Sequence, residues 1–281
     1  MIGVIILNYN TWRETINCIE SLDQNYNKGD ITVYVVDNKS PQRPDVDESV
    51  FFKRRNDVIL IEASANKGYS AGNNIGIKRA LEDGCEYIVI SNSDILFVDK
   101  SLYVMSKYID ENKTVGVVGP QILDVNGVFQ PFHMMSKLTA WGKLQYMLLQ
   151  TPFSFLARSF KNKFVYEKEL TIPIKVFSVL GCCFMMSRDC ASYLYPLDER
   201  TFLYEEEYIM GAILENSPYS VYILPNTNVI HAFGVSIGKV SRFSYKCLMD
   251  SEQIYLKEYL HSNILVRKFF LYLRKFFLAR L

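Results

Sequence analysis

The feature that most constrains this fold is an alternation of strand-like and helix-like segments over the first 123 residues. Five short apolar runs, typical of buried strands, lie at 3–10, 31–38, 58–64, 86–92 and 115–123. Segments in which apolar residues recur at helical spacing lie between them, at 11–24, 70–84 and 101–112. Short links between such elements predict an α/β fold with a mainly parallel sheet flanked by helices.

Polar side chains stand where three of these strands end. The first strand ends in Asn8 and Asn10, the second in Asp37, and the fourth in Asn92 and Asp94. Ligands of open α/β sheets bind beyond the carboxyl ends of the strands. A buried carboxylate is costly unless it is paired or bound to a metal. The sequence therefore predicts a ligand site at this edge of the sheet.

The second half of the chain is less regular. The expected elements are a hairpin at 124–132, helical structure in 138–165, a strand at 174–187 broken by Gly181, a helix at 205–216, a strand at 219–225 and a loop at 228–234. No repeat or low-complexity linker separates two domains, and 281 residues suit one large domain with an appendage.

Several classes of protein are disfavoured. A dinucleotide-binding fold needs G-x-G-x-x-G after the first strand, whereas this chain has NYNTWR there. None of the six cysteines has C-x-x-C spacing, which argues against a zinc site. The start MIGVIIL is too short for a signal peptide, and no stretch is apolar enough to span a membrane. A reducing cytoplasm is expected.

Eight motifs resemble one known family. In order they are VIILNYN, VVDNKS, NKGYSAGNNIGI, SNSDI, GPQILD, LGCCFMMS, FLYEEEY and IHAFGVS. Together they resemble glycosyltransferase family 2, particularly its rhamnosyltransferase-like members, over residues 3–237. The resemblance implies a GT-A fold and an inverting transfer from a nucleotide-diphosphate sugar. It also implies a domain at 1–240, with a donor-binding half (1–123) and an acceptor-binding, catalytic half (124–240), followed by a tail at 241–281.

The motif SNSD stands where the family carries its DxD-type metal motif. The resemblance implies that Asp94 binds Mg²⁺ or Mn²⁺, ions that prefer hard oxygen ligands. Asn92 replaces the first acid of that motif and would contact the ribose or the sugar instead. The late histidine of the family matches His231, which would bind the metal or the diphosphate. The alternatives are a turn-capping Asp94 and a core His231.

The resemblance places further donor contacts near the strand ends. Asp37 matches the residue that accepts a hydrogen bond from a uracil or thymine base. The nucleotide-binding loop and its neighbours are matched by Asn8, Asn10, Asn66, Gly68, Asn74 and Gly181. The alternative is that these residues only form turns, for which Asp, Asn and Gly are common.

An acceptor hydroxyl needs a general base, and FLYEEEY supplies three carboxylates. Glu207 matches the family's base, and Glu206 would orient the acceptor or replace it as base. Successive helical side chains point about 100° apart, so the three cannot share one pocket. Glu205 is expected to be only a charge at the helix N-terminus, favoured by the helix dipole.

The tail is basic and aromatic. Residues 239–281 carry nine Lys and Arg against three Asp and Glu, within a chain of net charge +1. On a helix over 266–281, one arc would hold Arg267, Lys268, Arg274 and Lys275, and the other Phe269, Tyr272, Leu273, Phe276 and Phe277. This pattern is typical of a helix that lies in a membrane interface. The alternative is a helix packed on the domain or on a homodimer partner, and nucleic acid is not expected.

The sequence therefore predicts an inverting glycosyltransferase that uses a UDP- or dTDP-linked sugar. Its acceptor would be a glycan or a lipid-linked acceptor in surface polysaccharide synthesis. It would be cytoplasmic, with peripheral contact of residues 264–281 on the inner face of the cell membrane. Two alternatives are a sugar-nucleotide or glycan-binding relative with impaired catalysis and a sugar-nucleotide nucleotidyltransferase. The latter should carry a Gly-rich, Lys-bearing loop after the first strand, where NYNTWR has neither.

Overall fold

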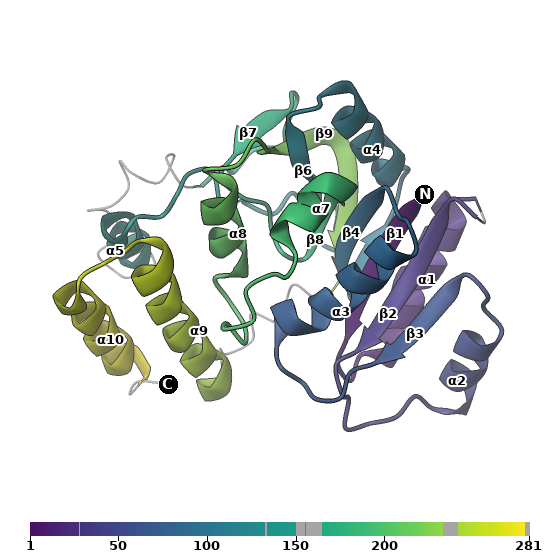
Figure 1. Ribbon diagram of the computed structural model, residues 1–281, viewed down its shortest axis with the longest axis horizontal. Helices are drawn as coiled ribbons and strands as arrows, with labels where there is room; N and C mark the ends of the chain where they lie inside the picture. The colour runs from purple at the N-terminus through teal and green to yellow at the C-terminus, as the bar shows by residue number, and fades with distance from the viewer. Residues whose placement is uncertain (28, 133, 150–154, 156–164, 233–240, 279–281) are drawn as a thin grey trace.

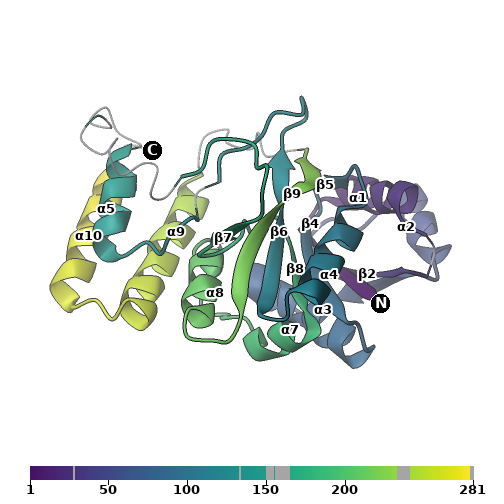
Figure 2. The same cartoon turned by 90° about the horizontal axis from the view of Figure 1, so that it is seen from above.

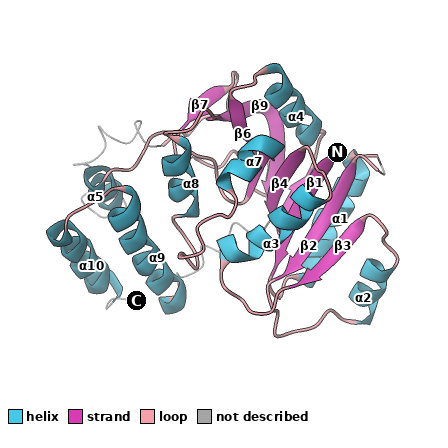
Figure 3. Ribbon diagram, in the orientation of Figure 1, coloured by secondary structure: helices cyan, strands magenta, loops and turns pink. Residues whose placement is uncertain are grey.

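The computed structural model describes residues 1–27, 29–132, 134–149, 155, 165–232 and 241–278. The strands of the described chain are β1 (Ile2–Asn8), β2 (Ile31–Asp37), β3 (Val58–Glu62), β4 (Tyr87–Asn92), β5 (Ile95–Phe97), β6 (Val115–Leu123), β7 (Ile174–Val176), β8 (Cys183–Ser187) and β9 (Ser220–His231). They form one sheet in the order β3-β2-β1-β4-β8-β6-β9-β5, and β7 pairs with β9 (Figure 3).

The helices are spread along the whole described chain. They are α1 (Trp12–Asn25), α2 (Val46–Lys53), α3 (Tyr69–Glu82), α4 (Ser101–Glu111), α5 (Ala140–Leu149), α7 (Arg188–Leu194), α8 (Glu206–Leu214), α9 (Arg242–Ile254) and α10 (Ile264–Leu278), with a π-helical turn η2 (Tyr255–Tyr259) after α9. Figure 1 shows the chain running from the parallel strands at one end of the molecule to α9 and α10 at the other.

The sheet has two unlike halves. Strands β3, β2, β1 and β4 are parallel, as the alternating pattern predicts. Beyond β4 the sheet is mixed, because β8 pairs antiparallel with both β4 and β6, and β6 pairs parallel with β9. The predicted α/β class is confirmed, but the parallel pairing predominates only in the first half.

One of the expected strand boundaries is wrong. The segment 174–187 forms the strands β7 and β8, with the predicted break at Gly181 in the connection between them. The predicted strand at 219–225 continues as β9 to His231, where a loop was predicted, and β9 pairs with β6 across an irregularity in register. Strand β9 has partners along its length, because it pairs with β6 on one side and with β7 and β5 on the other.

Each face of the sheet is covered by its own apolar layer. Along β1, Val4 and Ile6 pack with α1 and α4, whereas Ile5 packs with α3 and α7 on the opposite face. This alternation is the period-two pattern of a strand that is buried on both sides. Buried sheet faces hold the strands in register, so the carboxyl ends of β1, β2 and β4 meet at one edge.

The C-terminal helices form a separate helical layer. Figure 2 shows α5, α9 and α10 side by side, beyond α8. Met147 of α5, Leu256 of η2 and Phe270 of α10 form a small apolar core between them. The predicted helical structure in 138–165 is present as α5, and most of the remaining residues of that segment lie outside the described residues.

The tail helix presents a different face from the one predicted. Phe270 is buried, and Leu273 and Phe277 pack with it. Arg274 of the expected basic arc points inward and binds Glu252. Phe269 and Tyr272 are exposed at 47% and 70%. The buried side of α10 therefore combines Leu273 and Phe277 of the predicted aromatic face with Arg274 of the predicted basic arc, and Arg274 anchors the helix to α9.

Helix α2 and helix α7 were not expected from the spacing of apolar residues. Helix α2 begins with a capping box, in which Asp45 and Glu48 each accept a backbone N–H of the other. Helix α7 begins at Ser187, whose hydroxyl accepts a hydrogen bond from the backbone N–H of Cys190. The six cysteines are free thiols. Within the described chain, no helix is long and apolar enough to cross a membrane.

Candidate active site

The ends of β1 and β2 are tied together by side chains. Asn8 and Asp37 lie opposite each other in the parallel register. Asp37 Oδ1 accepts hydrogen bonds from Asn8 Nδ2 at 3.2 Å and from the Ser40 hydroxyl at 2.5 Å. The Ser40 hydroxyl also accepts the backbone N–H of Asn10, which has a left-handed φ of 59°. The buried carboxylate of Asp37 is therefore held by neighbouring polar groups, as its burial requires.

The loop before α3 is built on Asn66 and Gly68. Asn66 Oδ1 accepts the backbone N–H of Gly68 and the side-chain amide of Asn38, both at 3.0 Å. Gly68 has a φ of 97°, and a Cβ there would lie 2.2 Å from the carbonyl oxygen of Phe202. Only glycine meets both demands. The loop is thus packed directly on the segment that leads into α8.

Asn74 makes structural bonds rather than facing an open site. Its Nδ2 donates to the carbonyl of Leu197 at 3.0 Å and to Glu199 at 2.8 Å, and its Oδ1 accepts the N–H of Leu197. These bonds join α3 to the segment before α8. The predicted contact of Asn74 with the diphosphate or ribose gains no support from these bonds.

Asp94 and His231 meet because of strand pairing. Asp94 lies in the turn between β4 and β5, and β5 pairs antiparallel with β9 so that Ile95 faces His231. Nε2 of His231 lies 3.1 Å from Oδ2 of Asp94. This pair, distant in sequence, is the predicted metal-binding pair.

The Asp94–His231 pair suits a metal ion that binds together with a diphosphate. The described residues hold no cluster of three or more His, Cys, Asp and Glu side chains able to bind a metal. Mg²⁺ is commonly bound through one or two carboxylates plus substrate phosphates, and imidazole adds a ligand that Mn²⁺ accepts. The donor set therefore fits a metal shared with a diphosphate.

An open cleft of about 780 Å³ gathers the second group of predicted residues. It is lined by Asn92, Gly181, Glu206, Glu207 and His231. Asp94 does not line this cleft and instead lines a second hollow, together with Ser93 and Ala232. The cleft is thus bounded by the end of β4, the end of β9 and the first turn of α8, which makes it the candidate active site.

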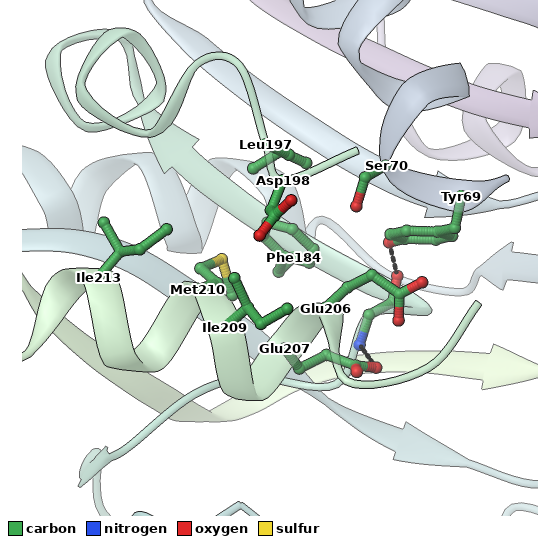
Figure 4. A pocket seen from close by; sticks show the side chains of 11 residues that line it. Tyr69, Ser70, Phe184, Leu197, Asp198, Glu206, Glu207, Ile209, Met210 and Ile213 are labelled. Carbon is green, nitrogen blue, oxygen red and sulfur yellow. Dashed lines mark hydrogen bonds between the residues drawn. The ribbon is translucent and has the colours of Figure 1, made fainter. Parts of the chain in front are cut away.

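Glu207 is held in the cleft by the backbone at Gly181. The N–H of Gly181 donates to Glu207 Oε1 at 3.0 Å, and the Gly181 carbonyl accepts the Tyr69 hydroxyl at 2.5 Å (Figure 4). A Cβ at Gly181 would lie 2.7 Å from Glu207 Oε1. Because Gly181 has no side chain, the Glu207 carboxylate can approach the backbone at this point. Tyr69 was not predicted.

The environment of Glu206 and Glu207 disfavours two negative charges. Burial raises the pKa of both carboxyls. The negative charge of Glu207 raises the pKa of Glu206 further, to about 8. Oε1 of Glu206 is buried without a hydrogen-bond partner among the described residues. The N–H of Gly181 offsets only part of the effect of burial on Glu207, so the pKa of Glu207 also stays raised.

Glu205 differs from expectation. It stands at the N-terminus of α8, but its side chain is only 4% exposed and binds Lys143 of α5 through both oxygens, at 2.6 and 2.7 Å. The prediction of a simple dipole-stabilised charge is corrected, since a buried cation compensates it. Nothing in the spacing around Lys143 could have revealed this contact, which joins residues 62 positions apart.

Comparison with known proteins establishes the family. The model of glycosyl transferase family 2 matches residues 3–194. The chain belongs to this family. It is 24% identical over 243 residues to the dTDP-rhamnosyl transferase RfbF of Shigella flexneri, covering 83% of this chain and 69% of that protein. The predicted family is therefore confirmed.

Solved structures of similar fold agree. GalNAc-T7 with UDP, GalNAc and Mn²⁺ superposes with a TM-score of 0.65 at 15% identity, covering 92% of this chain and 48% of that one. The family member therefore spans about half the length of that structure. TarS 1–349 of S. aureus in complex with UDP superposes with a TM-score of 0.54 at 15% identity, covering 96% and 69%. These likenesses support the GT-A fold.

Proposed function

We propose that this family member is an inverting glycosyltransferase that transfers a sugar from a UDP- or dTDP-linked donor to a glycan or lipid-linked acceptor in surface polysaccharide synthesis. The observation that carries the proposal is the cleft itself. It places a coupled pair of carboxylates, Glu206 and Glu207, beside the strand ends where Asn92 and His231 lie.

Glu207 is the general base. The acceptor hydroxyl oxygen attacks the anomeric carbon of the donor sugar, the bond from that carbon to the diphosphate oxygen breaks, and the hydroxyl proton passes to the Glu207 carboxylate. Attack opposite the leaving group inverts the anomeric configuration. Gly181 holds the carboxylate in place through its N–H. Glu206, protonated, orients the acceptor by donating a hydrogen bond.

The nucleotide-diphosphate sugar binds along the strand ends. Asp37 accepts the imide N–H of the pyrimidine, and Asn8, Asn10, Asn66 and Gly68 shape the loops around it. Support comes from the hydrogen bonds that fix Asp37 and Asn66 before any ligand arrives. The names of the relatives mention dTDP in one case and UDP in another, and both bases carry the imide group.

Asp94 and His231 hold Mg²⁺ or Mn²⁺ together with the donor diphosphate, and Asn92 contacts the ribose or sugar. When bound, the metal supplies charge stabilisation to the departing diphosphate. The supporting observations are the 3.1 Å separation of the Asp94 and His231 side chains and the Mn²⁺ reported with GalNAc-T7.

A panel of UDP-, dTDP- and GDP-sugars with and without Mn²⁺ tests this proposal by thermal shift and by release of nucleoside diphosphate. A bound ligand raises the melting temperature by mass action. We expect one pyrimidine donor to stabilise the protein only with the metal and to release its nucleotide. Stabilisation without release, with any offered acceptor, would favour a binding protein without catalysis. Release of pyrophosphate from a nucleoside triphosphate and a sugar phosphate would favour a nucleotidyltransferase.

We also propose that α10 makes peripheral contact with the inner face of the cell membrane. The exposed Leu265, Phe269 and Tyr272, flanked by Lys268 and Lys275, are suited to insertion beside anionic headgroups. Replacing Phe269 and Tyr272 by Ser should release the protein from anionic vesicles in co-sedimentation. Unchanged sedimentation, with a change of oligomer size in gel filtration, would favour a homodimer contact instead.

A further inference from the structure

A buried network of four charges connects the C-terminal helix with the start of the catalytic helix. Arg274 of α10 donates to both oxygens of Glu252 on α9, at 2.7 and 2.9 Å. Lys143 of α5 donates to both oxygens of Glu205 and lies 4.0 Å from Glu252. Glu252 is fully buried, and the side chains of Lys143 and Glu205 are 5% and 4% exposed. Two cations thus balance two carboxylates away from water.

The backbone at the same place is unusual. Tyr204 and Glu205 have φ angles of 74° and 71°, two successive left-handed residues without a glycine. Such conformations cost free energy and persist where the surroundings hold them. Glu205 is followed at once by Glu206 and Glu207, so the direction of this turn sets where the two carboxylates enter the cleft.

We infer that Lys143 and Arg274 are positioning residues for the transfer reaction, because together they hold the left-handed turn at Tyr204-Glu205 and thereby fix Glu206 and Glu207 in the cleft; this rests on the proposed function. Lys143 acts directly on Glu205. Arg274 acts through Glu252. It neutralises the Glu252 carboxylate, so that the ammonium group of Lys143 stays paired with Glu205.

Two aromatic rings, in addition to Glu205, contact the ammonium group of Lys143. Its Nζ lies 5.1 Å from the ring centre of Tyr208 on α8 and 5.0 Å from that of Tyr255 on η2. Cation–π contacts with both rings confine the ammonium group laterally. If Arg274 were lost, Glu252 would keep its burial without its cation, and Lys143 would be drawn towards it. The C-terminal helix is therefore part of the support of the active site, in addition to any contact with a membrane.

The matched control is Arg55 in the N-terminal half. It is 16% exposed, compared with 13% for Arg274, and binds the carboxylates of Asp23 and Asp57 at 2.6–2.8 Å. Each guanidinium also lies over an aromatic ring, at 5.5 and 5.9 Å. Arg55→Met therefore removes a two-oxygen guanidinium contact as Arg274→Met does, in a part of the chain that holds no catalytic carboxylate, although its partners Asp23 and Asp57 are 40% and 30% exposed and Glu252 is fully buried.

Steady-state kinetics of folded Lys143→Met, Arg274→Met and Arg55→Met should separate positioning from stability. A misplacement of catalytic groups by about 1 Å costs on the order of 10²-fold in rate. We expect kcat to fall about 10- to 100-fold in the first two variants with an unchanged donor KM, and to stay unchanged in Arg55→Met. Arg274→Lys should recover part of the loss. An unchanged kcat in folded Lys143→Met would overturn the inference.

Glu205→Gly separates the backbone from the ion pair. Glycine accepts the left-handed conformation without cost, and Lys143 can still turn to Glu252. We expect this variant to fold with a lower melting temperature, because the buried Lys143 loses its nearest carboxylate, and to show the same loss of kcat as Lys143→Met. Full activity would mean that the backbone conformation suffices, and the inference would be wrong.

Hydrogen exchange at the amides of residues 204–209 tests the inference without any substrate. Lys143→Met and Arg274→Met should exchange faster there, whereas Arg55→Met should not. If the wild type transfers no sugar, the proposed function fails, but this exchange result still decides whether the ion pairs hold the turn. Unchanged exchange in both variants would contradict the inference even in an active enzyme.

Discussion

The donor end of the cleft and the catalytic helix are built in opposite ways. At the ends of β1 and β2, Asn8, Ser40 and Asp37 satisfy one another through hydrogen bonds, and Asn38 Oδ1 is the one buried atom there without a partner among the described residues. At the start of α8, Glu206 has a buried oxygen without a partner, and burial raises the pKa of Glu206 and Glu207. The hydrogen bonds of the first region are formed before ligand binding. In the second region, burial disfavours the charged forms of the two carboxylates.

The two steps of the proposed reaction, donor recognition and proton transfer, are divided between these two regions. Donor recognition needs a preorganised surface, which the hydrogen-bonded loops supply at low cost in ordering. Proton transfer needs a base whose pKa is raised towards the working pH, which burial and a neighbouring carboxylate supply. We therefore expect substitutions in the two regions to have separable effects on stability, binding and turnover.

The largest effect is expected from Glu207→Gln. This substitution keeps the volume and the Gly181 contact but removes the base, so kcat should fall by roughly 10²- to 10⁴-fold. Binding of the nucleoside diphosphate should persist, because the donor loops are unchanged. Calorimetry of binding beside a turnover assay checks both. If Glu206→Gln is the inactive variant and Glu207→Gln is active, the roles of the two carboxylates are reversed.

Two glycine substitutions compare the regions directly. In Gly68→Ala the new Cβ meets the backbone of Phe202, which cannot move aside, at a φ of 97°. In Gly181→Ala it meets the end of the Glu207 side chain. We expect Gly68→Ala to lower the free energy of unfolding by about 1–3 kcal/mol or more. Gly181→Ala should be nearly as stable as the wild type, with kcat about 10²-fold lower.

Denaturant unfolding and turnover of both variants provide the measurement. The comparison fails if Gly181→Ala is the less stable of the two, or if Gly68→Ala folds well and loses only kcat. Either result would mean that rigidity and reactivity are not divided between the two regions as described.

The smallest effect is expected from Glu206→Gln in the protein without ligands. The pKa of Glu206 is raised to about 8 in the fold, so its contribution to stability is lost as the pH rises through that value. Glutamine does not titrate. The melting temperature of Glu206→Gln relative to the wild type should therefore rise between pH 5 and pH 9. A difference that is constant with pH would show that Glu206 is not protonated in the fold.

Much of the fold could be predicted from the sequence because its signals are local. The apolar runs and helical spacing of the first 123 residues specify β1, α1, β2, β3, α3, β4, α4 and β6 closely. The insertion of β8 between β4 and β6 could not be predicted, since antiparallel and parallel partners of a buried strand have similar composition. Helix α2 could have been found from its capping box.

The candidate site was predictable only where polar residues follow strands or form a motif. Asn92, Glu206, Glu207 and His231 were placed by such signals, and they line one cleft. Lys143 and Arg274 were not, because a cation on an amphipathic helix gives no sign of which carboxylate it meets. For the same reason the helical wheel of α10 could not show that Arg274 points inward, since Glu252 lies on another helix.

The most direct test of the central claim is calorimetric titration of UDP and dTDP into the wild type, Glu207→Gln and Asp94→Ala, with and without Mn²⁺. The claim is that a metal-bound nucleotide diphosphate sits at the strand ends, apart from the catalytic base. It predicts equal, Mn²⁺-dependent affinities for the wild type and Glu207→Gln, and loss of the Mn²⁺ dependence in Asp94→Ala. Nucleotide binding that is indifferent to Mn²⁺ in all three proteins, or absent from the wild type, would contradict it.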